Sequence, residues 1–127
     1  MSRPRRPSIA AVMEAAGEDP TGVPDAVVVP APRWLARRWA GRIAAMTLPG
    51  RIVVAPDRYP AFVAGEDPEL LRHEVEHLRQ WHRDGILRFL VRYLADYGSA
   101  RMAGMPHHAA YRAIRYEVAA RARELPE

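Results

Sequence analysis

The hydrophobic and polar positions along this chain of 127 residues predict a small sheet followed by helices. The β-branched run Ala26–Pro30 predicts a strand. Two further apolar runs, Arg42–Leu48 and Arg51–Ala55, flank a Pro49-Gly50 turn and predict a β-hairpin. Apolar periodicity and end signals predict the helices, which are expected over Ile9–Ala16, Arg33–Trp39, Pro68–Asp84, Ile86–Tyr97 and about Pro106–Glu124.

Several residues mark the ends of these helices. Ser8 is a candidate N-cap of the first helix, and Asp67 is a candidate N-cap with Pro68 at the first helical position. Gly85 is expected to separate the two helices on either side of it. Residues 56–65 and 98–106 are expected to be irregular.

This order of elements predicts an α+β fold, with a small antiparallel or mixed sheet of about three strands followed by a bundle of three helices. Residues 1–127 are expected to form a single domain with a core over about 26–124, preceded by a flexible basic arm at 1–7. The large aromatic side chains are expected in the core; they are Trp34, Trp39, Trp81, Phe89 and Tyr93.

The amino-acid composition excludes several kinds of catalytic and metal site. The chain has no cysteine, which excludes disulfides, thiolate zinc sites, iron–sulfur clusters and a cysteine nucleophile. A transition metal would therefore need His, Asp or Glu ligands. All 19 basic residues are arginines, and they exceed the 15 acids to give a net charge of +4. Because these bases are scattered among acids, the charge is interpreted as a compositional bias, and no nucleic-acid partner is expected.

No segment is long and apolar enough to predict a membrane span. The longest apolar stretch, Gly85–Leu94, is interrupted by Arg88 and Arg92 and is far shorter than the roughly 20 residues that a span needs. The sequence therefore predicts a cytoplasmic protein without a membrane partner, and a monomer is the default expectation.

The strongest chemical signal is His73-Glu74-Val75-Glu76-His77, which fits the pattern H-E-x-x-H inside a predicted helix. Two histidines four residues apart project from one helix face and can bind one metal ion, for which zinc is the natural choice. Glu74 can take a proton from a water at the metal and return it to a leaving amine.

A catalytic zinc usually has a third protein ligand. His82 lies about 140° further round the helix from His77, and Glu76 is expected to face solvent. The last helix leaves His107, His108 and Glu117. Glu117 is favoured because it is a lone carboxylate among small and apolar residues, where an unpaired charge is costly. The alternative is an ion pair of Glu117 with Arg121 or Arg72.

The chain resembles a group of very small bacterial H-E-x-x-H domains. Two segments carry the resemblance: the motif followed by Leu78-Arg79-Gln80-Trp81, and the later segment His108-x-x-Tyr111-Arg112-x-x-x-Tyr116-Glu117-Val118-x-Ala120. These domains look like minimal gluzincins, thermolysin-like zinc peptidases with a zincin-like fold. The resemblance covers roughly residues 40–121. It implies that His73, His77 and Glu117 are ligands of Zn²⁺ and that Glu74 is the general base. The longer metalloprotease pattern with a third histidine is excluded, because Gln80 and Arg83 stand where it needs Gly and His.

In this class an exposed edge strand pairs with an extended peptide, and Arg51–Ala55 is the expected strand. The donor that stabilises the developing oxyanion is expected to be Tyr111 or His108. Three functions are therefore considered. They are a zinc-dependent peptidase acting on a peptide or protein, a catalytically silent metal-stabilised module that binds a peptide or protein, and an arginine-rich nucleic-acid binder in which the motif is accidental.

Overall fold

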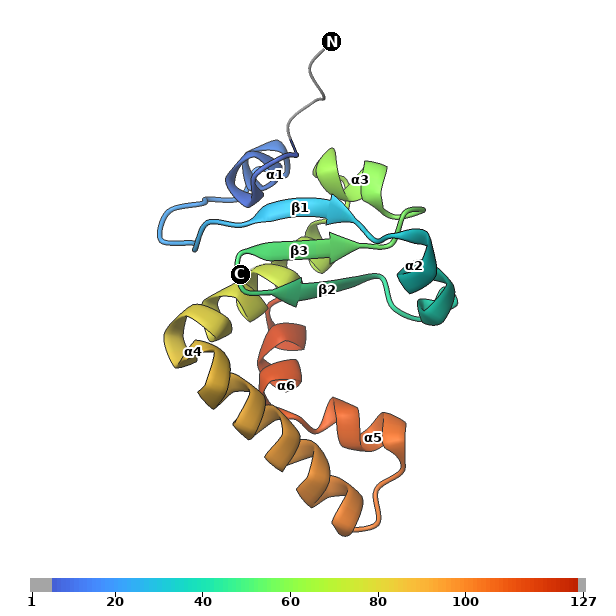
Figure 1. The fold of residues 1–127 in the computed structure, drawn as a ribbon. Helices are drawn as coiled ribbons and strands as arrows, with labels where there is room; N and C mark the ends of the chain where they lie inside the picture. Colours follow the sequence, from blue (N-terminus) through green and yellow to red (C-terminus); the bar gives the residue numbers. More distant parts are fainter. Residues whose placement is uncertain (1–5, 126–127) are drawn as a thin grey trace.

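A computed structural model describes residues 6–125 of the chain, and it has an α+β architecture (Figure 1). The predicted three-stranded sheet is confirmed, and most of the helices follow it in the sequence. The elements, in chain order, are α1 (Ile9–Ala15), β1 (Val27–Pro30), α2 (Arg33–Trp39), β2 (Ala45–Leu48), β3 (Arg51–Val54), α3 (Tyr59–Val63), α4 (Pro68–Met102), α5 (His107–Arg112) and α6 (Arg115–Ala122).

The sheet is mixed, with the strand order β1-β3-β2. β2 and β3 form the predicted antiparallel hairpin, with Thr47 opposite Ile52, and β1 runs parallel to β3, with Val28 beside Ile52. The expectation that Arg51–Ala55 is an exposed edge strand is wrong, because β3 has a neighbour on each side. In a hairpin of β2 and β3 alone, the outer side of β3 would be an open edge. Here β1 pairs with that side, so the edge strands of the sheet are β1 and β2.

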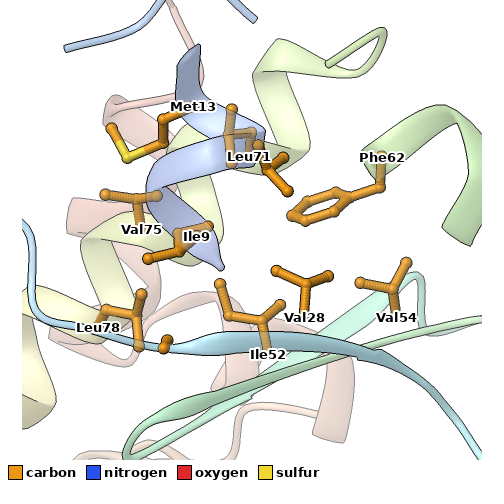
Figure 2. Close-up of a cluster of buried hydrophobic side chains, with 11 residues drawn as sticks. Ile9, Met13, Val28, Ile52, Val54, Phe62, Leu71, Val75 and Leu78 are labelled. Atoms are coloured by element: carbon orange, nitrogen blue, oxygen red, sulfur yellow. The ribbon is translucent and has the colours of Figure 1, made fainter. Parts of the chain in front are cut away.

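One face of the sheet is covered, and the other is covered only in part, since Val27, Met46 and Leu48 on it are exposed. Ile52 and Val54 point to one face, where they meet side chains of α1, α3 and the first half of α4 (Figure 2). Val53 points to the other face and packs with Trp39 of α2. The alternation follows the two-residue period of a strand. The first face matters most for function, because it holds the start of α4 against the sheet.

The N-terminal helix belongs to the core. Ile9, Val12 and Met13 are buried against the sheet, so the expected core of 26–124 extends to α1. Ser8 caps α1 as predicted, through its hydroxyl and the N–H of Ala11. The carbonyl of Pro7 accepts a hydrogen bond from the N–H of Val28, which ties the end of the expected arm at 1–7 to β1. Residues 1–5 of that arm lie outside the described residues.

α4 is interrupted where the sequence predicts a break. Asp67 caps its start as expected, and Gly85 adopts φ 78° and ψ 164°, a conformation outside the helical region. The helix resumes immediately and continues to Met102, five residues beyond the expected end at Tyr97. Beyond the kink, Phe89 packs on Ile114 and Tyr116 in a separate small cluster. This half of α4 and α5 extend away from the sheet past β2 (Figure 1).

The last predicted helix is two helices. Ile114 has an extended backbone, with φ −62° and ψ 127°, and separates α5 from α6. No glycine or proline marks this break in the sequence. Tertiary contacts explain it, because Ile114 is fully buried beside Phe89 and the carboxylate of Asp96 accepts a hydrogen bond from the first N–H of α6 at Arg115.

Two further expectations are corrected. Residues 59–63, expected to be irregular, form the short helix α3, whose Phe62 is buried against the sheet. Trp34, expected in the core, is 64% exposed, whereas Trp39 and Phe89 are buried and Trp81 and Tyr93 are partly buried against Phe89. Within residues 6–125, no helix has the length and hydropathy that crossing a membrane requires.

Candidate metal centre

Three potential metal ligands meet between α4 and α6. His73 and His77 lie one turn apart on α4, and Glu117 faces them from the first turn of α6. The Nε2 atom of His73 lies 3.3 Å from Oε1 of Glu117, and Nε2 of His77 lies 3.2 Å from both carboxylate oxygens. The three ligand atoms all lie within 4.8 Å of one another. The structure therefore brings together the three residues that the sequence selects as ligands.

The distances from each histidine to Glu117 can be compared with those between the ligands of a small tetrahedral ion. Zinc bonds to imidazole nitrogen and carboxylate oxygen at about 2.0–2.2 Å, which places ligands at tetrahedral corners about 3.3–3.6 Å apart. The nitrogen-to-oxygen distances of 3.2 and 3.3 Å come close to that edge length. The side chains are also largely shielded from water, with exposed fractions of 15% for His73, 9% for His77 and 5% for Glu117.

The second ring nitrogen of each histidine is held in place. Nδ1 of His77 lies 2.7 Å from Oε1 of Gln80, and Nδ1 of His73 lies 2.9 Å from Oε1 of Glu124. Gln80 is oriented in turn, because its Nε2 donates to the carbonyl of Tyr116. Because the amide nitrogen of Gln80 donates to Tyr116, its amide oxygen faces His77. That oxygen can only accept a hydrogen bond, so Nδ1 of His77 is the donor.

This arrangement accommodates either a proton or a metal ion between His77 and Glu117. With Nδ1 carrying the proton, the Nε2 lone pair of a neutral His77 points directly at the carboxylate of Glu117, which is also an acceptor. Two acceptors at this distance repel unless a second proton or a metal ion lies between them. The donor set of two imidazoles and one carboxylate is one that zinc accepts.

The pKa shifts follow from the same geometry. Burial favours the neutral form of Glu117, but the hydrogen bonds and positive charge of His73 and His77 outweigh it and hold its pKa well below the usual range. Burial disfavours the charged imidazoles, but hydrogen bonds to Glu117 and the nearby acidic charges raise the pKa of both histidines. The site is therefore strongly attractive to positive charge.

Glu74 is buried next to the first ligand. Its Oε2 accepts a hydrogen bond of 2.5 Å from the hydroxyl of Thr47 on β2. Burial raises the pKa of this carboxyl, against the opposing effects of His77 and Thr47. A carboxylate with a raised pKa is better suited to take up a proton than an exposed one. β2 thus positions the residue that the sequence selects as the base.

Two tyrosines flank the carboxylate of Glu117. The hydroxyl of Tyr93, on the second half of α4, donates to Oε2 of Glu117 over 3.4 Å. Burial and the charge of Glu117 raise the pKa of Tyr93 and of Tyr111, so both hydroxyls keep their protons. Tyr111 is the more accessible of the two, at 40% exposed, and is a hydrogen-bond donor beside the candidate metal centre.

The remaining sequence candidates lie elsewhere. His108 is exposed at the start of α5, and no hydrogen bond or ion pair within residues 6–125 joins it to the ligands. His107 is also exposed and contacts Tyr97. His82 is exposed, in keeping with its exclusion as a ligand.

The charged residues near the ligands differ partly from expectation. Glu76, expected to face solvent, is buried and forms ion pairs with Arg79 and Arg123. The alternative partners of Glu117 are engaged away from it. Arg72 binds Glu18 and the carbonyl of Glu124, and Arg121 donates to the carbonyl of Arg112.

Four residues around the site were not selected from the sequence: Thr47, Gln80, Tyr93 and Glu124. Gln80 alone had a local signal, because it lies three residues after His77 and so neighbours it on the helix. The other three reach the site from β2, from beyond the kink of α4 and from the turn after α6, which only the tertiary fold brings together.

The chain was compared with protein-family models, with curated proteins and with solved structures, and none of the three comparisons found a match.

Proposed function

We propose that the protein is a zinc-dependent metallopeptidase of the minimal gluzincin-like, zincin-fold type that the sequence resembles. The observation that carries the proposal is the convergence of His73, His77 and Glu117, with the buried carboxylate of Glu74 beside the first of them. Two histidines, one carboxylate and an adjacent acid are the groups that metal-assisted hydrolysis of an amide requires.

His73, His77 and Glu117 would hold a zinc ion, which would polarise the substrate carbonyl and activate a water for attack. Glu74 takes the proton that the water loses as its oxygen bonds to the carbonyl carbon, and passes it to the nitrogen of the leaving amine when the amide bond breaks. The hydroxyl of Tyr111 donates a hydrogen bond to the developing oxyanion. His108 is the other candidate for that task, and Tyr111 is favoured because it interacts with Glu117, whereas no hydrogen bond or ion pair within residues 6–125 joins His108 to the ligands.

In the proposed function, the peptide pairs with β2. This strand is an edge of the sheet, and its Thr47 contacts Glu74. Leu48 and Arg51 flank the two-residue turn, so the backbone groups of Thr47 and Ala45 point outward from the hairpin. The indole of Trp81 already donates to the carbonyl of Thr47, over 2.9 Å, which leaves the Ala45 end for an extended peptide.

A second function is favoured by one observation. The low exposure of the three ligands is also typical of a metal that stabilises a fold, in a module that binds a peptide or protein without cleaving it. A His₂–carboxylate set also suits iron(II), so elemental analysis of the purified protein identifies the metal.

The test compares the wild type with Glu74→Gln, Glu117→Ala and His108→Ala. We expect about one zinc per chain in the wild type, in Glu74→Gln and in His108→Ala, and its loss from Glu117→Ala. Hydrolysis of a broad peptide library is expected for the wild type and not for Glu74→Gln. Undiminished cleavage by Glu74→Gln would refute the mechanism. Stoichiometric zinc without any cleavage by the wild type would support the silent module.

A further inference from the structure

The outward face of the second half of α4 is apolar. Leu87, Val91, Leu94 and Met102 follow one another at helical spacing and are 77%, 59%, 65% and 92% exposed. The opposite face of the same helical segment carries Phe89 and Tyr93, which pack toward Ile114 and Tyr116. This segment therefore has two apolar faces, one covered by the protein and one turned to solvent. We call the solvent-facing set, with Ile86 and Leu90, the apolar ridge.

The net charge of the molecule is concentrated in the same region. Residues 83–115 contain six arginines and two aspartates, whereas the rest of the chain contains thirteen arginines and thirteen acids. The excess of +4 thus comes entirely from the segment that carries the ridge. Arg88 and Arg92 lie on one flank of the ridge, about 100° and 140° from Leu87 around the helix. Asp84 pairs with Arg83 and, over 3.8 Å, with Arg92 itself, and Asp96 pairs with Arg115, so Arg88 is the flanking arginine without an aspartate partner among these pairs.

The positive charge of residues 83–115 favours one class of binding partner over the others. A second copy of the chain would bring one positively charged segment against another, which is unfavourable. A nucleic acid would need the arginines at the outermost face, where the apolar side chains stand. An anionic bilayer surface satisfies both features, because lipid tails accept the aliphatic side chains while the flanking arginines reach the headgroups.

The shape of the apolar ridge is compatible with binding to a lipid bilayer. The ridge is the convex outer side of a helix whose other side is occupied by the protein, and α4 and α5 extend away from the sheet at this end (Figure 1). A bilayer interface adapts to such a convex surface, whereas a groove on a protein would have to be shaped for it. We propose that the apolar ridge and its arginines bind the surface of anionic membranes.

This contact is peripheral. No helix within the described range 6–125 is long and apolar enough to cross a membrane. The sequence-based expectation of no membrane partner considered spanning segments alone, and the proposal concerns binding at the surface. It does not depend on the metal centre or on peptidase activity.

The experiment is co-sedimentation of the full chain with lipid vesicles. We expect binding to vesicles of phosphatidylglycerol and phosphatidylcholine, weakening as salt increases, and little binding to phosphatidylcholine alone. Leu87→Ser/Leu94→Ser should weaken binding at least tenfold, and Arg88→Gln/Arg92→Gln by roughly fivefold for each charge removed. Circular dichroism checks that both variants remain folded.

Matched controls lie on α2. Trp34→Ser removes an exposed apolar side chain, and Arg37→Gln/Arg38→Gln removes two exposed charges outside the basic segment. Both are expected to bind as the wild type does. The proposal is overturned if the wild type does not bind anionic vesicles, or if the ridge variants bind as well as the controls. A wild-type dimer in light scattering that Leu87→Ser/Leu94→Ser dissociates would assign the ridge to a second copy instead.

Discussion

At the scale of single residues, the histidines of the candidate centre depend on neighbours that do not themselves touch the ligand position. Gln80 and Glu124 each hold the Nδ1 atom of one ring, so that both Nε2 atoms face Glu117. Such partners fix the tautomer and orientation of a metal-binding histidine and strengthen its bond to the metal. The two supports differ, because Gln80 is fully buried in α4 whereas the side chain of Glu124 is 38% exposed.

Replacing Glu124 therefore tests the support of His73 with little disturbance of packing. We expect Glu124→Ala to weaken zinc binding about 10- to 100-fold. Glu124→Gln keeps an acceptor for Nδ1 and should retain most of the affinity. Competition with a chromophoric chelator of known affinity measures both. Equal affinities of Glu124→Ala and the wild type would show that this hydrogen bond does not support the metal.

Asp84 gives a prediction for acid stability. Its carboxylate accepts hydrogen bonds from Arg83 and from the hydroxyl of Tyr116, and these lower its pKa to about 2 from an ordinary value of 3.8. Because the folded-state pKa is depressed, the stabilisation is present above about pH 4 and is lost as the pH falls toward 2. Asp84→Asn should remove this part of the pH dependence.

The measurement is the free energy of unfolding in urea at a series of acidic pH values. The difference between the wild type and Asp84→Asn should shrink as the pH falls from about 4 to 2. Asp57→Asn removes the same charge from the exposed loop after β3 and serves as the control. A difference that stays constant over this range would contradict the assignment.

At the scale of elements, the backbone conformation of Gly85 produces the kink in α4. Its φ of 78° with ψ of 164° is a conformation that essentially glycine alone adopts, and beyond the adjoining chain no atom lies within 4 Å of the position a Cβ would take. The strain of a substitution there would therefore come from the backbone and not from a clash. The kink matters for the site, because the second half of α4 carries Tyr93 to Glu117.

We expect Gly85→Ala to lower the free energy of unfolding by about 1–3 kcal/mol. Gly98 is the matched control, since it lies in the regular part of the same helix with open space around it. Gly98→Ala should stabilise the protein by about 0.5–1 kcal/mol. Urea denaturation measures both, and a Gly85→Ala variant as stable as Gly98→Ala would show that the kink is not required.

The elements that the sequence predicts correctly are those with local causes. The cap at Ser8, the cap at Asp67, the turn at Pro49-Gly50 and the break at Gly85 each follow from a residue and its immediate neighbours. The break at Ile114 has no such signal, because it depends on burial beside Phe89 and on the carboxylate of Asp96, 19 residues away. The parallel pairing of β1 with β3 is equally non-local, and it is why β3 lies inside the sheet and not at the expected edge.

In the candidate site, too, some residues are predictable from local sequence and others depend on the tertiary fold. The two histidines and Glu74 are recognisable from spacing on one helix, and Glu117 from its apolar surroundings in the sequence. The positions of Thr47 and Glu124 follow from how β2 and the end of α6 pack on α4, which spacing along the chain does not encode.

At the scale of the whole molecule, the proposed metal would join α4 to α6, which also meet through packing and through hydrogen bonds such as that of Gln80 with the carbonyl of Tyr116. Because ion binding would favour the folded state over the unfolded one, removing the metal should lower the melting temperature. At a free zinc concentration about 100 times the dissociation constant, the expected contribution is about 2.7 kcal/mol.

Thermal unfolding with and without a chelator measures this effect. Glu117→Ala is the control, and its melting temperature should not respond to zinc or to the chelator. A wild type that melts at the same temperature in both conditions would mean that zinc does not bind the folded state preferentially.

The position of Glu117 relative to His77, 40 residues along the chain, has a further consequence. A chain without cysteine cannot form a disulfide, and an ion bonded to both residues would act as a reversible cross-link closing that loop. The exposed turn at residues 103–106 lies inside the loop. A protease cut there would leave two fragments that a bound ion would still connect, beside contacts such as that of Arg115 with Asp96, and withdrawal of the ion would weaken their association.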